Sequence, residues 1–276
     1  MADLAAISVF ISAVFGLIFG SFLNVCIYRL PRDLSVVAPR SFCPFCRRQI
    51  HWYDNFPLLS YALLGGRCRT CKASIGWRYP VVEAATALLF AGTVVEFGLT
   101  MPALKWVVFG CLMMVLFWTD AETRVLPDEL TLGGTAVGLA FSLFVPPFGG
   151  PAALLVPQAS ASLISIANSI IAAFLLSVPF AAFAYGYTRL RGIMPPGWGD
   201  VKLLAMLGAF LGLEQGLLAM ILGSVGGTVL GGGYILVKKK DPRIHALPLG
   251  TFLCAGGVIA AFWGPRIIQW WWRLNG

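Results

Sequence analysis

The stretch LKWVVFGCLMMVLFWTD, residues 104–120, is an apolar run that ends on an aspartate. A second apolar run, DVKLLAMLGAFLGL, residues 200–213, begins on one. A carboxylate at membrane depth costs roughly 2.5–3.5 kcal/mol on insertion scales. Two apolar segments of this chain carry such a carboxylate at one end in spite of its cost. Asp120 and Asp200 are therefore candidate functional residues.

The composition of the chain is that of a membrane protein. Of its 276 residues, 58% are hydrophobic and only 12% are charged. A bilayer core of about 30 Å needs about 20 apolar residues per helix. Runs of suitable length lie at 4–27, 80–100, 103–120, 129–147, 163–187, 216–237 and 249–270. With the shorter run at 201–213, the sequence predicts an all-α polytopic membrane protein of about eight transmembrane helices.

The net charge of +8 is distributed in a way that favours a membrane orientation over a nucleic-acid partner. Of the 20 Lys and Arg residues, 17 lie in the segments 29–79, 120–128, 188–202 and 238–247. An external N-terminus would place all four segments in the cytoplasm, as the positive-inside rule requires. The basic groups before and after 201–237 then both need the cytoplasmic side. This stretch must therefore leave and return, which favours a short sixth span and eight crossings.

The segment 29–79 differs from the rest of the chain because it is polar, basic and rich in cysteine. About 50 residues can form only a small hydrophobic core, so a bound metal ion is expected to stabilise the segment. The segment holds two CxxC pairs, formed by Cys43, Cys46, Cys68 and Cys71. Four thiolates at this spacing are typical of a closed structural zinc site. Two disulfides are the alternative, and the expected cytoplasmic placement disfavours them.

The expected topology places Asp120 and Asp200 near the same membrane face, because one ends an inward helix and the other begins an outward helix. Paired carboxylates suit water-driven amide hydrolysis: the ionised one takes a proton from water, and the protonated one polarises the carbonyl. The alternative is that these residues are helix caps at the water interface, a role that also suits Asp128. Position alone leaves both interpretations open.

Several stretches resemble the bacterial prepilin leader peptidases, which are membrane aspartic peptidases of the GxGD type. The two regions around the aspartates are TDAETRVLPDELTL (119–132) and GWGDVKLLAMLGAFLG (197–212). The N-terminal stretches are GLIFGSFLNVCIYRLP (16–31), PRSFCPFC (39–46), DNFPLLSY (54–61) and RCRTCKASIGWRYPVVE (67–83). The resemblance covers nearly the whole chain in the family's order. One departure is LPLGT (247–251), where the family has a Pro-Phe-Gly-Pro-like stretch.

The resemblance implies an activity and a division of the chain. Asp120 and Asp200 would be the catalytic pair, Asp128 a neighbour, and the four cysteines zinc ligands. The enzyme would lie in the bacterial inner membrane with its catalytic pair toward the cytoplasm. It would cut the basic leader from type IV prepilins or type II secretion pseudopilins. The implied domains are a first transmembrane helix (1–28), a cytoplasmic zinc-binding domain (29–79) and a membrane aspartic peptidase domain (80–276).

Many bacterial members of this family also methylate the new N-terminus with S-adenosylmethionine. No residues here independently indicate a binding site for that cofactor. Glu83 has two interpretations: a pair with an arginine at the cytoplasmic edge, or a role in methyl transfer suggested by its RYPVVE context.

If only the residue types and positions are considered, without the family resemblance, two other functions remain open. A proton-coupled transporter would use intramembrane carboxylates as relays, but it should carry inverted repeats and midplane binding residues, which the sequence lacks. A scaffold docked through the zinc module would function without the aspartates.

Overall fold

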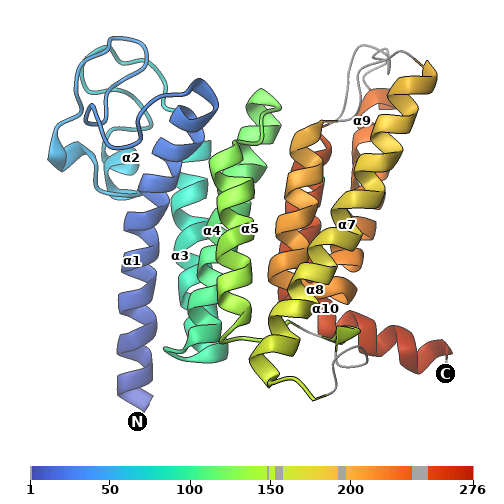
Figure 1. Ribbon diagram of the computed structural model, residues 1–276. Helices are drawn as coiled ribbons and strands as arrows, with labels where there is room; N and C mark the ends of the chain where they lie inside the picture. Colours follow the sequence, from blue (N-terminus) through green and yellow to red (C-terminus); the bar gives the residue numbers. More distant parts are fainter. Residues whose placement is uncertain (1, 148, 153–157, 192–196, 238–247, 276) are drawn as a thin grey trace. The chain divides into compact units, whose positions relative to one another are not determined.

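The computed structural model describes residues 2–147, 149–152, 158–191, 197–237 and 248–275 (Figure 1). The basic segment 238–247 therefore lies outside the described residues. The longer helices are α1 (Ala2–Arg29), α3 (Arg78–Phe97), α4 (Met101–Thr123), α5 (Asp128–Ser142), α7 (Ala161–Arg191), α8 (Trp198–Gly226) and α10 (Leu249–Asn275). The shorter ones are η1 (Leu30–Arg32), η2 (Trp52–Asp54), α2 (Leu59–Leu63), η3 (Gly227–Gly231) and α9 (Gly232–Val237).

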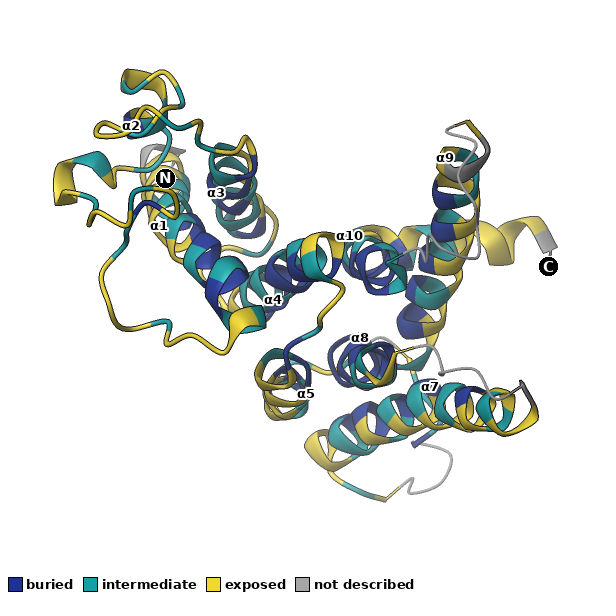
Figure 2. Ribbon diagram, turned by 90° about the horizontal axis from the view of Figure 1, so that it is seen from above, coloured by how far each residue is buried: buried dark blue, intermediate teal, exposed yellow. Residues whose placement is uncertain are grey.

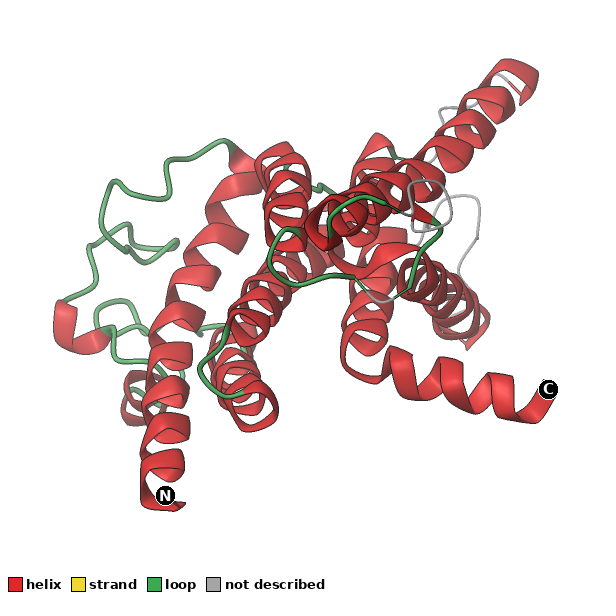
Figure 3. Cartoon of the chain, turned by 60° about the horizontal axis from the view of Figure 1, so that its bottom comes forward, coloured by secondary structure: helices red, strands yellow, loops and turns green. Residues whose placement is uncertain are grey.

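The prediction of an all-α polytopic membrane protein is confirmed. Within the described residues, no strand is present beyond two isolated bridges (Figure 3). Six helices in that part of the chain are long and apolar enough to cross a membrane: Leu4–Arg32, Arg78–Phe97, Met101–Thr123, Ala161–Leu190, Trp198–Tyr234 and Leu249–Leu274. The expected eight crossings stay a prediction. The helix α5 has only 15 residues, and the fifth of these helices contains the expected span 201–213 and most of the expected span 216–237.

The chain forms two compact units, Met1–Val115 and Leu116–Gly276. In the first unit, α1 and α3 run side by side, and the residues between them form the insertion (Figure 1). Gly16 and Gly20 lie one turn apart on α1, and a Cβ on either would come within 2.8 Å of the backbone of α3. This spacing is the small-xxx-small pattern that lets membrane helices approach closely.

Replacing Gly16 by Leu is expected to destabilise the first unit by about 1–3 kcal/mol or more. A Cβ at Gly16 would lie 2.6 Å from the Cα of Ala87, and backbone cannot move aside as a flexible side chain can. Thermal unfolding of the protein in detergent measures the change. Gly92→Leu on α3 is the matched control, because nothing lies within 4 Å of its Cβ position. Equal midpoints for the two variants would contradict this account of the packing.

In the second unit, α8 lies between α5, α7 and α10 (Figure 2). Most residues of α8 before Gly212 are buried. Gly212 interrupts α8 with φ 78° and ψ −175°, a conformation open essentially to glycine alone. A Cβ at Gly216 would lie 3.8 Å from the Cα of Gly208. Eight residues of straight helix rise about 12 Å, so the chain reverses at Gly212 and its two arms lie side by side. A leave-and-return path through the membrane, which the charge pattern predicts, needs such a reversal, and the crossing itself stays a prediction.

Candidate active site and metal centre

Asp120 and Asp200 lie together in the second unit, although 80 positions separate them. Asp120 lies in the last turn of α4 and is 5% exposed, and Asp200 lies in the first turn of α8 and is 9% exposed. The two carboxylates are close enough for their charges to interact. The structure thus brings together the two residues that the sequence places on one membrane face.

The first turn of α10 holds the carboxylate of Asp120. The backbone N–H of Thr251 donates to Oδ2 of Asp120, and the Thr251 hydroxyl donates to the same oxygen at 2.8 Å. A Cβ at Gly250 would lie 3.0 Å from both Cγ and Oδ2 of Asp120, so glycine at this position allows the close approach. Sequence reasoning missed Thr251 as a partner of Asp120 and noted only that the stretch around it departs from the family.

The capping alternative for Asp200 does not match the local structure. The N-cap of α8 is Gly197, and it makes no side-chain capping bond. Asp200 lies three positions later, where its backbone N–H donates to the Gly197 carbonyl. Its carboxylate is buried and near enough to Asp120 for the two charges to interact.

Asp128 has a different environment from the buried pair. It begins α5, its side chain is 58% exposed, and both of its oxygens accept from Nζ of Lys202 at 2.6 Å. An exposed carboxylate with a lysine partner is a surface ion pair. The structure therefore distinguishes the exposed Asp128 from the buried Asp120, whereas their positions in the sequence do not.

The two CxxC pairs lie in hairpins of the same construction. In the first, Cys43 N–H donates to the Arg48 carbonyl, and Arg47 N–H donates to the Cys43 carbonyl. The first of these bonds recurs 25 positions later, from Cys68 N–H to the Ala73 carbonyl. An isolated bridge closes each hairpin. The insertion therefore carries a short internal repeat whose two copies each present a pair of thiols.

The four thiols of these hairpins meet at one point. The sulfur atoms of Cys43, Cys46, Cys68 and Cys71 all lie within 4.8 Å of one another. Cys43 Sγ and Cys71 Sγ are 3.8 Å apart. Tetrahedral zinc with bonds of about 2.3 Å places its sulfur ligands about 3.8 Å apart, so the cluster fits this ion. All seven cysteines are free, so the two-disulfide alternative does not match the structure.

One thiol of the cluster is primed for metal binding by the backbone. Hydrogen bonds from the backbone amides of Cys71 and Thr70 lower the pKa of Cys68 from 9.0 to about 7. Metal ions bind cysteine as the thiolate, so less proton displacement is needed at Cys68. Burial and hydrogen bonds with the other thiols raise the pKa of Cys71 to about 11, so this thiol must give up its proton to the metal.

Comparison with known proteins gives the chain a family. The model of the Bacterial Peptidase A24 N-terminal domain matches residues 14–97, and that of the Type IV leader peptidase family matches residues 107–232. The first range contains the four thiols, and the second contains both buried aspartates. No solved structure matches the chain.

Curated relatives align with nearly the whole chain. A prepilin leader peptidase/N-methyltransferase of Bacillus subtilis is 32% identical over 95% of this chain and 96% of its own length. Proteins of the same name from Aeromonas hydrophila and Pseudomonas aeruginosa are 32% and 33% identical. They cover 93% and 92% of this chain and 91% and 90% of their own lengths. The resemblance seen in the sequence is thus confirmed, and this multi-pass membrane protein belongs to the type IV leader peptidase family.

Proposed function

We propose that this protein cuts the basic leader from type IV prepilins or pseudopilins and methylates the new N-terminus. Asp120 and Asp200 would be the catalytic pair, at the cytoplasmic face of the bacterial inner membrane. The observation that carries the proposal is the meeting of two buried carboxylates from distant helices, one of them held by Thr251. The curated relatives carry both activities in their names.

The proposed cleavage uses the pair as acid and base. Repulsion between the two carboxylates leaves one proton shared between them. The ionised aspartate takes a proton from water as its oxygen attacks the scissile carbonyl carbon, and the protonated aspartate gives its proton to the carbonyl oxygen. When the C–N bond breaks, the leaving amine takes the proton that came from water. The other aspartate regains its proton from the former carbonyl oxygen.

The substrate is itself a membrane segment. Its apolar helix would lie against the spanning helices, which expose many large apolar side chains suited to lipid or to another helix. The leader junction must then be extended near Asp120 and Asp200 before hydrolysis, because two carboxylates can flank only an exposed peptide bond. Partners of the protein are therefore the prepilin precursors and the bilayer.

The proposed metal and cofactor have separate roles. Zinc would be held by Cys43, Cys46, Cys68 and Cys71, and four thiolate ligands leave it structural, with no open position for catalysis. S-adenosylmethionine, when bound, supplies a methyl group on a positively charged sulfur to the amine that cleavage frees.

A cleavage assay tests the proposed function. The purified protein in nanodiscs is incubated with a prepilin fragment that carries a basic leader and a Gly-Phe junction. Mass spectrometry should detect the leader and the mature product. With S-adenosylmethionine present, the product should gain the mass of one methyl group. An intact substrate would contradict the peptidase, and complete cleavage without added mass would remove the methyl transfer.

Replacing Thr251 by Val should lower kcat for cleavage about 10- to 100-fold and leave KM nearly unchanged. Valine keeps the shape and the backbone N–H but removes the hydroxyl that donates to Asp120. A hydrogen bond to a charged group contributes about 1.5–3 kcal/mol, which corresponds to this range of rates. Steady-state kinetics measure the effect.

Thr251→Ser is the matched control, because it restores the donor. If it restores kcat, Thr251 positions the Asp120 carboxylate through its hydroxyl. If the Val and Ser variants are equally impaired, the methyl group matters and the hydrogen bond does not, which would contradict this role.

A further inference from the structure

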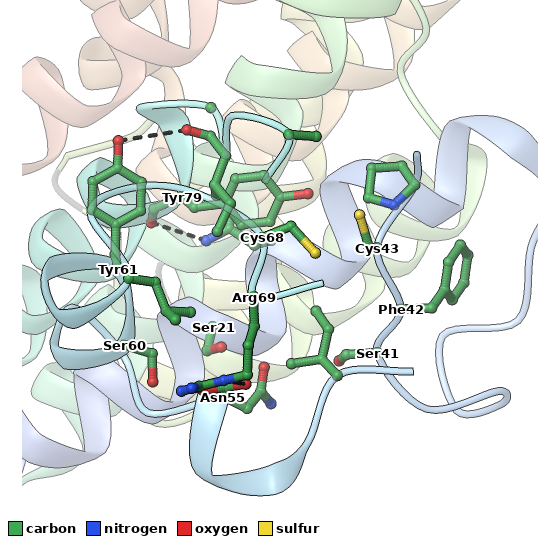
Figure 4. A pocket seen from close by; sticks show the side chains of 18 of the residues that line it. Ser21, Ser41, Phe42, Cys43, Asn55, Ser60, Tyr61, Cys68, Arg69 and Tyr79 are labelled. Carbon is green, nitrogen blue, oxygen red and sulfur yellow. Dashed lines mark hydrogen bonds and ion pairs between the residues drawn. The ribbon is translucent and has the colours of Figure 1, made fainter. Parts of the chain in front are cut away.

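The buried aspartates lie apart from the cavity of the first unit. That cavity, of about 470 Å³, is lined by residues of α1, α3 and the insertion, and its lining contains neither Asp120 nor Asp200 (Figure 4). The two aspartates are 5% and 9% exposed and belong to the second unit. A peptide bond can reach them only past the side chains that cover them. These side chains therefore limit which substrate residues can approach the pair.

Leu126 lies next to the pair, in the connection between α4 and α5 (124–127). A Cβ on Gly250, in the first turn of α10, would lie 3.0 Å from Cδ1 of Leu126. The same position lies 3.0 Å from Cγ and from Oδ2 of Asp120. A methyl group of the leucine and the carboxylate of Asp120 are therefore neighbours of one point on α10.

The same leucine also packs against the start of α8. A Cβ on Gly199 would lie 3.0 Å from Cβ and 3.2 Å from Cδ1 of Leu126. Gly199 directly precedes Asp200. Gly250 directly precedes Thr251, which holds the other aspartate. Leu126 thus contacts a glycine beside each half of the pair, at distances that leave no space for a side chain on either glycine.

The backbone around Leu126 is restricted on both sides. Arg124 has a φ of 57°, a left-handed conformation that few residues other than glycine adopt. Pro127 follows directly, is buried, and serves as the N-cap of α5. A residue before a proline is confined largely to extended conformations. Leu126 is half-buried, so its side chain reaches from the surface to the surroundings of the pair as a wall of fixed position.

We propose that Leu126 determines the size of the substrate residue that can lie beside the scissile bond, and that it admits glycine and excludes larger residues. The inference rests on the proposed cleavage and adds a residue that sets its specificity. The scissile peptide must come within hydrogen-bonding reach of both carboxylates. The space next to them is bounded by Leu126 and by the backbone of Gly199 and Gly250. Substrate backbone without a Cβ fits beside such a wall more closely than backbone that carries one.

Two prepilin fragments that differ at one position test the proposal. One carries a Gly-Phe junction and the other an Ala-Phe junction, and each is incubated with the full-length protein in nanodiscs. The wild type should cleave the glycine fragment with a kcat/KM roughly 10- to 200-fold higher, which is the discrimination that one carbon atom gives in a tight apolar site. Leu126→Ala should lower this ratio about tenfold, because it opens space for the methyl group of alanine.

The ratio separates specificity from stability. Both substrates are cut by the same preparation, so partial unfolding of a variant lowers both rates equally and leaves their ratio unchanged. Val125→Ala is the matched control, because it removes a neighbouring side chain that is 41% exposed, and it should keep the wild-type ratio. Leu126→Ile conserves the volume of the side chain and should keep most of the discrimination.

The outcomes distinguish this inference from the proposed function. If the wild type cuts the Gly-Phe fragment but Leu126→Ala keeps the wild-type ratio, the role of Leu126 is refuted and the peptidase stands. A wild type that cuts both fragments equally well, or a Val125→Ala variant that lowers the ratio as much as Leu126→Ala does, would also contradict the inference. A wild type that cuts neither fragment refutes the peptidase and this inference with it.

Discussion

Replacing either Asp120 or Asp200 by Asn should lower the rate of leader cleavage by about 10⁴-fold or more, as the loss of a member of a catalytic unit does. Asparagine keeps the shape of the side chain but cannot exchange protons at neutral pH. Both residues are buried and interact electrostatically, so each substitution disrupts the sharing of one proton. Initial rates with a prepilin fragment measure the loss, with thermal unfolding as a check that each variant is folded.

Asp128→Asn is the matched control for these substitutions. Asp128 belongs to the same stretch of sequence as Asp120, but it is exposed and bound to Lys202. Exposed ion pairs contribute about 0–1 kcal/mol, so cleavage should change by roughly twofold at most. A large loss in this variant, together with activity in Asp120→Asn, would move the catalytic role to Asp128.

Removing the zinc ligands should unfold the insertion and release the metal. Elemental analysis of the wild type is expected to find one zinc per chain, and the double variant Cys43→Ser/Cys68→Ser none. Structural zinc contributes about 10–16 kcal/mol of apparent binding free energy in small domains, which is large for a segment of about 50 residues. Limited proteolysis should then cut within 30–77 while the long helices stay intact.

The control for the metal is Cys111→Ser, which changes a thiol on α4 outside the cluster. Zinc content should be unchanged in this variant. Because zinc binds cysteine as the thiolate, protons compete with the metal for all four sulfur atoms, and zinc should be lost from the wild type in acid. A wild-type protein without zinc, or a double variant that retains it, would contradict the metal assignment.

Much of the fold could be predicted from local patterns. Apolar runs predicted the helices, the basic loops predicted their direction, and the CxxC spacing predicted the metal-binding insertion. The meeting of Asp120 and Asp200 followed from the parity of the crossings. The reversal at Gly212 was also implied by charge on both sides of the stretch, although no local pattern marks the turn residue. The 15-residue length of α5 was not foreseen, because the apolar run there continues to residue 147 beyond the helix.

The contact between Thr251 and Asp120 could not be predicted from the sequence. The two residues are 131 positions apart, and a threonine at the start of a helix ordinarily suggests a cap. Only the packing of α10 against the end of α4 gives it a carboxylate to hold. The repeat in the insertion was not identified from the sequence, although a local signal exists: SFCPFCRRQIHW (41–52) and GRCRTCKASIGW (66–77) share cysteines, isoleucine and tryptophan in register.

The central claim is that Asp120 and Asp200 act as one catalytic unit. The most direct test compares cleavage rates of Asp120→Asn, Asp200→Asn and the double variant under identical conditions. Members of one unit are strongly non-additive, so each single variant should lose nearly as much activity as the double. If the losses multiply, or if either single variant cleaves at the wild-type rate, the two aspartates do not share one reaction and the account is wrong.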